Sequence, residues 1–530
     1  MYRLKRLFQS KKKVKFSGII ILLLVSIFIL RDIQLSDFNS KNRIIEGDVL
    51  HYYAYLPALL VYNDLKLDFV AKAPGKFSDR FWPVVAPNGK YVIMTTMGMS
   101  VMYAPFIIPT HYFLKITGKD ADGYSKPYKI ALLISAIFYL CLALILIRKL
   151  LLVYFSDTVT SLVLISLALG TNLIHYATRE AAFSHAYSFF LIIWFVFNTI
   201  RYYKKPDFLY AILLGLSAGL IALVRPTNII VFIILPLWGV SSWSEFKARA
   251  SLLLSHWKHI IVFALVLIST LVPQMLYWKM TSGVYFFNGY GDGGKFFFNN
   301  PQFANILFSY RKGWLLYTPM MILPLIGFIW LYRINKGIFY TVLIYFIINT
   351  YVLSSWWLWW FGGSYGNRAF IDMYGLLAFP LAAFFHYLLS KKSILLKVLP
   401  FLLVLVFVTH NLFQLQQYQN GAIHYVSMTK EAYWDSFGKL KPSAEFSKLL
   451  VFPDYKAAKK GIYPRPVVQN AVKTKINTDK AIEKTPEFYE NQIRNSPGMM
   501  KQIEEKAKIN NISLDSAIKV DAIWLYKKNK

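Results

Sequence analysis

Long apolar stretches, separated by short polar connections, recur along most of the chain. A helix needs about 20 apolar residues to cross the hydrocarbon core of a bilayer. The pattern therefore predicts about eleven transmembrane helices, at 16–33, 127–148, 157–177, 183–202, 208–224, 226–241, 258–280, 313–332, 336–355, 369–389 and 394–415. The first follows a basic segment, residues 1–15, and no small-residue cleavage site follows it. We expect an uncleaved first helix with a cytoplasmic N-terminus.

The short connections predict the orientation. Basic residues are frequent in five of them, 148–155, 201–207, 245–259, 332–337 and 390–397. Since cytoplasmic loops carry an excess of Lys and Arg, we assign these five to the cytoplasm, and the loop 34–126 and the tail from 416 to the outer face. The apolar segment 99–114 is short and contains two prolines. We interpret it as an interfacial or re-entrant helix; if it spans, every later loop changes sides.

Composition agrees with a membrane protein. Of the 530 residues, 56% are hydrophobic and 16% are charged, against about 25% charged in soluble domains. The net charge of +32 would indicate nucleic-acid binding in a soluble protein, but here many basic residues lie between apolar segments, as orientation signals do. The single cysteine, Cys141, lies in an apolar run, which excludes a disulfide framework and a cysteine metal site. The polar, Lys-rich region 416–530 predicts a soluble, partly helical tail after a transmembrane domain, 16–415.

The stretch EGDVLHYYAYLPALL, which begins at Glu46, places two carboxylates beside a tyrosine stripe. One interpretation is an interfacial helix whose acidic N-terminus suits the helix dipole. The other makes Asp48 a general base that takes a proton from an acceptor hydroxyl, with Glu46 or His51 assisting. Tyr52 lies on the same helical stripe as Asp48. These residues alone leave both interpretations open.

Other ionisable residues gather at helix ends on the same predicted face. They are Arg179, Glu180 and His185 in YATREAAFSHAYSFF, Arg225 in ALVRPTNII, Arg311 and Lys312 in FSYRKGWLLYTP, and Arg368 in SSWWLWWFGGSYGNRAFIDMYG, whose tryptophans include Trp360. Each one alone is typical of an interfacial anchor. Together they indicate a site for an anionic, lipid-borne substrate, because the forked donors of arginine suit phosphate and indole rings suit sugars and lipid tails.

As an ordered set, these segments resemble the GT-C superfamily of integral-membrane glycosyltransferases, above all the protein O-mannosyltransferases and the lipid A aminoarabinose transferases. The resemblance covers roughly 16–415 and includes NGKYVIMTTMGMSVMYAP, REAAFSHA, RPTN, RKGWLLYTP and WWFGGSYGNR. It implies an all-α GT-C-like bundle. It also implies an enzyme that moves a sugar from a polyprenyl-phosphate donor to a lipid, glycan or protein acceptor on the outer face.

The resemblance further implies roles for single residues. Asp48 falls on the catalytic aspartate of the first outer loop, whereas Glu46 departs from the adjacent Asp-Glu pair of the mannosyltransferases, which leaves its role open. Arg225 and Arg368, then Arg311 and Lys312, are candidates for the donor phosphate. Acceptor or supporting contacts fall to Glu180, His185, Arg179, Tyr52 and Trp360. A divalent metal ion is left open, with Glu180 as its possible ligand. Displacement in one step would invert the anomeric centre.

Two other functions fit the same predicted face. A lipid-linked polysaccharide polymerase or ligase would share the carrier chemistry. A transporter or flippase of lipid-linked sugars would favour inverted repeats and charges near mid-membrane, whereas the long spans here are nearly free of charge. We expect a multi-pass protein of the bacterial inner (plasma) membrane, with its active site on the periplasmic side.

Overall fold

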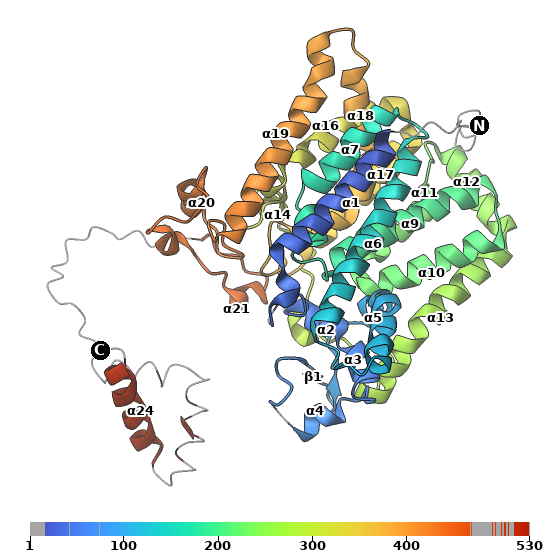
Figure 1. Ribbon diagram of the computed structural model, residues 1–530. Helices are drawn as coiled ribbons and strands as arrows, with labels where there is room; N and C mark the ends of the chain where they lie inside the picture. The colour runs from blue at the N-terminus through green and yellow to red at the C-terminus, as the bar shows by residue number, and fades with distance from the viewer. Residues whose placement is uncertain are drawn as a thin grey trace. The chain divides into compact units, whose positions relative to one another are not determined.

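The computed structural model describes residues 16–466 except 42 and 74, residue 468, single positions between 490 and 507, and residues 513–528. The basic segment 1–15 therefore lies outside the described residues. Contacts divide the chain into two compact units, Met1–Val468 and Gln469–Lys530. The first unit, shown in Figure 1, contains every residue of the candidate site.

The described part of the first unit is mostly helical. Its α-helices are α1 (Phe16–Leu35), α2 (Asp48–Tyr53), α3 (Tyr55–Leu60), α4 (Asp68–Lys72), α5 (Gly98–Ile116), α6 (Lys126–Leu151), α7 (Asp157–Leu169), α8 (Leu173–Ala177), α9 (Ser184–Lys204), α10 (Phe208–Val224), α11 (Ile234–Leu237), α12 (Trp243–Ser255), α13 (Trp257–Ser282), α14 (Phe303–Phe308), α15 (Trp314–Tyr317), α16 (Ile322–Ile334), α17 (Lys336–Ser355), α18 (Tyr374–Leu389), α19 (Ile394–Gln419), α20 (Lys430–Ser436) and α21 (Tyr455–Ala458).

Shorter elements complete the unit. The 3-10 helices are η2 (Asp37–Asn39), η3 (Pro226–Ile233), η4 (Gly291–Gly293), η5 (Pro319–Met321), η6 (Arg368–Met373) and η7 (Phe446–Leu449). Strands β1 (Val84–Val85) and β2 (Tyr91–Val92) form an antiparallel hairpin in which Val84 pairs with Val92.

Six helical segments are long and apolar enough to cross a membrane: α1, α6, α13, α17, α19, and η6 with α18. Shorter apolar helices are α7, α10, Pro226–Leu237 and Pro319–Ile334. Each of the eleven predicted spans coincides with helical structure, but several are shorter than predicted or interrupted. Proline explains the interruption of the predicted span 313–332: it has no backbone N–H to donate, and a new helical segment begins at Pro319. The break before Pro226 lies where the sequence predicts it, between the spans 208–224 and 226–241. The fold is thus a polytopic helical bundle with fewer full-length spans than the sequence predicts.

The predicted interfacial segment 99–114 lies within α5, a 19-residue helix that contains Pro105 and Pro109. This helix is not among the six candidate spans. Its first turn packs closely on α10, because a Cβ at Gly98 would lie 2.3 Å from the carbonyl carbon of Leu223. Whether α5 is interfacial stays a prediction.

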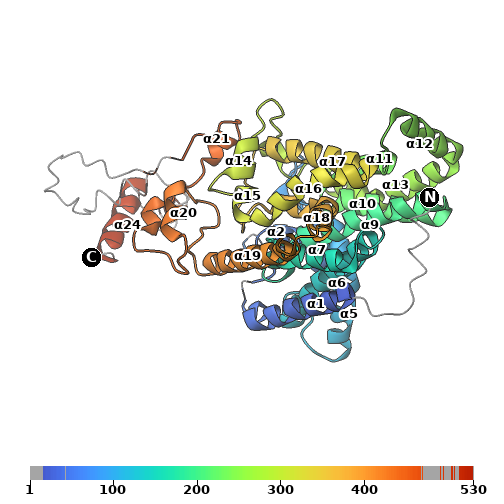
Figure 2. The same cartoon turned by 90° about the horizontal axis from the view of Figure 1, so that it is seen from above.

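Helix α18 lies at the centre of the bundle. It contacts α6, α7, α9, α16, α17 and α19, and most of its side chains are buried. Figure 2 shows α18 and α7 between a flank that contains α1 and a flank that contains α17. In Figure 1, α2, α3 and α4 lie at the opposite end of the bundle from the α18–α19 connection. Since η6 directly precedes α18, this rigid core fixes the residues of η6.

Residues 420–463 pack against the bundle. Ile423, Met428, Tyr433 and Phe446 form a hydrophobic cluster with Tyr317. The contact boundary at 468 therefore lies later than position 416, where the change in composition placed it. In the second unit, α24 (Leu514–Lys528) contributes to a small apolar cluster that includes Ile493, Ile503 and Ile518.

Candidate active site

The structure brings Asp48 into contact with Arg368, which lies 320 positions further along the chain. Asp48 opens α2 directly after Gly47, whose φ of 55° and ψ of −130° are rarely adopted by residues with a side chain. Arg368 opens η6 after a loop in which Phe361, Gly362 and Gly366 all have positive φ. These two turns direct the side chains toward each other, and Arg368 Nη2 donates to Asp48 Oδ2 at 2.7 Å.

This ion pair is only partly shielded from solvent. Arg368 exposes 13% of its side chain, and Asp48 exposes 42%. Burial raises the pKa of Asp48, but the Arg368 guanidinium outweighs it, so the pKa of Asp48 lies below its usual value. Asp48 is therefore a carboxylate at neutral pH, with one side open to a reaction partner.

A second network surrounds Asp372 on the same 3-10 helix. Arg225 Nε lies 3.3 Å from Asp372 Oδ2, and Asn228 Nδ2 donates to that oxygen at 2.9 Å. His185 Nδ1 lies 3.3 Å from Asp372 Oδ1 and 3.0 Å from Arg225 Nη1. The side chains of Asp372 and His185 are buried, whereas Arg225 exposes 16% of its side chain. Helix η6 thus supplies a cation to Asp48 and an anion to Arg225.

A third group lies at the connection between α8 and α9. Glu180 Oε1 lies 3.3 Å from His175 Nε2, and Glu180 Oε2 is buried without a hydrogen-bond partner. Burial raises the pKa of Glu180, but nearby His175 and Arg368 outweigh it, so its pKa is below the usual value. The buried ammonium of Lys312 donates to the backbone and hydroxyl oxygens of Ser364. Burial lowers the pKa of Lys312 well below its usual value, and Glu180 opposes this shift.

The other predicted residues of the first outer loop flank Asp48. Glu46 pairs with Arg43 at 3.3 Å, half-exposed, and burial raises the pKa of Glu46 against the opposing charge of Arg43. His51 packs edge-on against Trp82 with ring centroids 5.8 Å apart. Burial lowers the pKa of His51 from its usual value of 6.5 despite Asp48, so the ring is neutral at pH 7. Burial raises the pKa of the Tyr52 hydroxyl, as does the charge of Asp48.

Three predicted residues make their contacts elsewhere. Arg179 Nε lies 3.8 Å from Asp37 Oδ2 in η2. Arg311 donates to the carbonyls of Val426 and Val451, at 3.1 and 3.3 Å. The Arg311 guanidinium also lies 5.6 Å from the ring centroid of buried Trp360. In this structure Arg311 and Trp360 thus attach the 420–463 segment to the bundle.

Sequence reasoning did not select Asp372, Asn228 or His175. Two of them lie in segments that the sequence analysis did select. Asn228 is the last residue of RPTN, and Asp372 follows Arg368 by four residues. His175 directly precedes the quoted YATREAAF. A buried carboxylate needs a partner, so the pairing of Asp372 with Arg225 had a physical signal. Its identity depended on the tertiary fold.

A divalent metal ion, which the sequence leaves open, would need several ligands close together. Within the part of the chain that the structure describes, no group of three or more His, Cys, Asp or Glu side chains is arranged to hold a metal ion. Glu180, the acid considered as a ligand, has one histidine beside it.

Comparisons with known proteins give distant matches to solved structures. No family model and no curated protein matches the chain. An oligosaccharyltransferase of Archaeoglobus fulgidus, crystallised with Zn and sulfate, aligns with a TM-score of 0.43 and 13% identity over 82% of this chain and 58% of that one. Its apo form gives a TM-score of 0.47 and 12% identity over 94% and 60% of the two chains.

A third match is the archaeal oligosaccharyltransferase AglB from the same organism, in complex with an inhibitory peptide and a dolichol-phosphate. Its TM-score is 0.42, with 11% identity over 95% of this chain and 59% of that one. The chain therefore spans less than two thirds of the structures that it matches. All three TM-scores lie below 0.5, so these matches do not establish a shared fold.

Proposed function

We propose that this protein is a GT-C-like membrane glycosyltransferase that moves a sugar from a polyprenyl-phosphate donor to an acceptor hydroxyl, with Asp48 as the general base. The observation that carries the proposal is the contact between Asp48 and Arg368. Asp48 is an ionised carboxylate that is partly exposed to solvent, and it lies in the first large loop. Its partner Arg368 is a cation of the kind that binds phosphate. An acid that only compensated the dipole of α2 would have no need of this partner.

The chemistry requires little else from the protein. A sugar phosphate is an activated donor, so transfer needs a base for the acceptor hydroxyl and cations for the leaving phosphate. Asp48 serves as the base, and Arg368 and Arg225 stabilise the phosphate with charge-assisted hydrogen bonds. Attack opposite the leaving group inverts the anomeric centre.

Arg368 has a second effect in this proposal. While it donates to Asp48, it keeps the pKa of that carboxylate low and weakens it as a base. When the donor phosphate engages Arg368, the cation is shared and the pKa of Asp48 rises. Binding of the donor therefore strengthens the base before the acceptor is deprotonated.

The remaining candidates have supporting roles. Neutral His51 and the hydroxyl of Tyr52 border Asp48, and Glu46 lies two positions before it. Glu180 has a buried oxygen without a partner, which suits a hydroxyl donor of the acceptor or of the sugar. His185 orients Asp372 and thereby Arg225.

The test is the Asp48→Asn variant. It keeps the shape of the side chain but cannot take a proton, so transfer of labelled sugar from a polyprenyl-phosphate donor in membranes should fall about 10²- to 10⁴-fold. Rates are normalised to inserted protein. Asp68→Asn, which removes an exposed acid at the start of α4, is the matched control and should keep its activity.

Other outcomes would contradict the proposal. Normal transfer by Asp48→Asn would return Asp48 to the role of a helix-terminal acid. A product that grows by many repeat units would identify a polymerase or ligase. Movement of the intact donor across the bilayer, without its consumption, would identify a transporter or flippase.

A further inference from the structure

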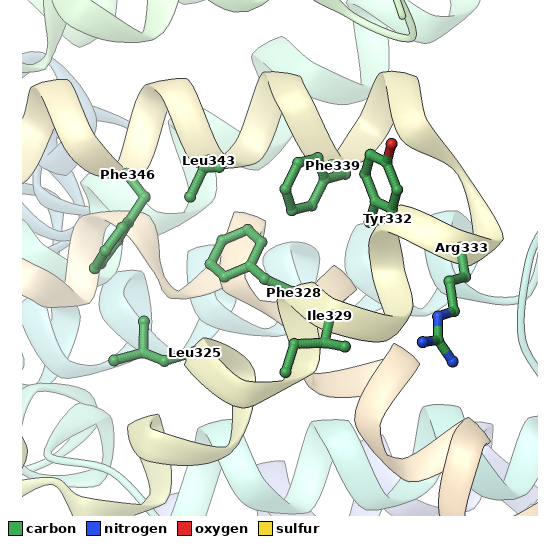
Figure 3. Close-up of a pocket in the computed structure, with 8 residues that line it drawn as sticks. All are labelled: Leu325, Phe328, Ile329, Tyr332, Arg333, Phe339, Leu343 and Phe346. Carbon is green, nitrogen blue, oxygen red and sulfur yellow. The ribbon is translucent and has the colours of Figure 1, made fainter.

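A large apolar cavity lies between α16 and α17, two helices that contain none of the candidate active-site residues. Its volume is about 620 Å³, within the range of ligand-binding pockets. Seven apolar or aromatic side chains and a single cation, Arg333, line it (Figure 3). The reaction proposed above gives this cavity no role.

Helices α16 and α17 each pack closely against another part of the bundle. A Cβ at Gly327 of α16 would lie 2.0 Å from the carbonyl oxygen of Pro380 in α18. On α17, a Cβ at Gly337 would lie 2.2 Å from the carbonyl oxygen of Gly239, and the Thr341 hydroxyl donates to the Leu237 carbonyl at 2.7 Å. With both helices seated against their neighbours, they cannot move together to close the cavity without losing these contacts.

The lining changes in character along the cavity. Leu325 and Phe346 lie at one end and Arg333 lies at the other, next to Tyr332 (Figure 3). Arg333 follows Leu325 by eight positions, which is about 12 Å along a helix and close to the roughly 15 Å depth of one leaflet. Ile329 and Tyr332 expose 56% and 39% of their surfaces, so the cavity has an open side between its two ends.

The cationic end lies at the turn between α16 and α17, within the basic connection 332–337. Lys336 lies on the same turn, with its ammonium 5.1 Å from the ring centroid of Tyr332. Among the described residues, Arg333 has no carboxylate within ion-pair distance. Its charge is therefore available to a ligand at this end of the bundle.

We propose that this cavity binds an anionic phospholipid, with one acyl chain along the apolar lining and the phosphate on Arg333. The apolar lining matches the acyl chain of such a lipid, and the cation at its end matches the phosphate headgroup. Basic pockets between transmembrane helices are known to bind anionic headgroups. A zwitterionic lipid also has a phosphate, but its own ammonium group offsets the attraction of that phosphate to Arg333. The site is separate from the sugar-transfer site and does not depend on the function proposed for it.

The test is a lipid titration of the purified full-length protein, followed by native mass spectrometry. Phosphatidylglycerol should bind in preference to phosphatidylcholine of the same chains. Arg333→Gln should weaken the first phosphatidylglycerol about 5-fold, the effect of one basic residue at an anionic lipid surface. Lys392→Gln removes an exposed charge from the α18–α19 connection and should change nothing.

A second variant tests the chain-binding part of the site. Leu343→Trp fills the cavity and should abolish the preference for phosphatidylglycerol; Leu343→Phe replaces it if the larger side chain prevents folding. Three results would overturn the proposal. They are equal binding of both lipids by the native protein, full binding by the cavity-filled variant, and displacement of the lipid by soluble glycerol phosphate, which would show that Arg333 binds a free phosphate.

Discussion

Arg368 determines how readily Asp48 accepts a proton. The carboxylate has two opposing influences, burial that raises its pKa and the guanidinium that lowers it, and the guanidinium prevails. Glu180 shows the same balance: its pKa is also lowered by cationic neighbours against burial. Each acid is thus kept ionised by a particular basic residue.

Removal of Arg368 should therefore shift the pH dependence of activity. In Arg368→Gln, burial loses its main opponent, so the pKa of Asp48 rises. A general base is inactive below its pKa, and the acidic limb of the kcat/KM profile should move to higher pH. Loss of one charge-assisted contact should also weaken the donor about 10- to 150-fold, from roughly 1.5–3 kcal/mol.

Arg225→Gln separates the two effects. It removes a proposed phosphate contact without a direct bond to Asp48, so it should weaken donor use and leave the acidic limb in place. Both variants are compared by pH–rate profiles in membranes containing equal amounts of inserted protein. An unshifted limb in Arg368→Gln would show that Asp48 is not the group whose titration limits the rate.

At the scale of elements, the short helices α2 and η6 position the residues of the candidate site, and each helix follows a turn with positive φ. Gly47 has a backbone conformation that a side chain makes costly, about 1–3 kcal/mol. Nothing lies within 4 Å of a Cβ there, so the cost of a substitution comes from the backbone and not from a clash.

Gly47→Ala should reduce transfer more than it reduces folding, because relief of the strain reorients Asp48 away from Arg368. Gly89→Ala is the matched control: its φ of 80° is also positive, a Cβ there also meets open space, and it lies in the β1–β2 hairpin. Sugar transfer and thermal unfolding of both variants are measured. Equal activity in the two would mean that the turn at Gly47 does not position the base.

The sequence predicted the helices well but not the pairings of the site. A long apolar run can be recognised from the local sequence alone, and all eleven predicted segments coincide with helical structure. The interruption at Thr318 reflects the Pro319 step, which hydropathy alone does not resolve, whereas the predicted end at Val224 coincides with the end of α10. The pairing of Asp48 with Arg368 spans 320 positions, and no local pattern encodes it. The sequence analysis assigned residues 420–463 to the tail because lysines and prolines are frequent there. The apolar residues that contact Tyr317 are scattered among them and form no long apolar run.

At the scale of the whole molecule, the basic connections predict which end of the bundle faces the cytoplasm. In a Cys141→Ser background, a cysteine at exposed Ser78 or Ser447 should react with an impermeant maleimide from outside, and one at exposed Ser390 should not. Reaction at Ser390 with protection at Ser78 would invert the topology and place the candidate site in the cytoplasm.

Several apolar helices are shorter than a bilayer is thick. Helix α7 has 13 residues, about 20 Å, and the apolar segment Pro319–Ile334 falls within 10–17 residues, against a hydrocarbon core of about 30 Å. Hydrophobic mismatch of this size is relieved when the surrounding lipid thins. The bilayer should therefore be thinner around the protein. The phosphate of a lipid next to the protein would then lie closer to the middle of the membrane than in an undisturbed bilayer. Reconstitution in lipids of shorter acyl chains should then raise turnover, since less deformation is needed before donor and acceptor meet.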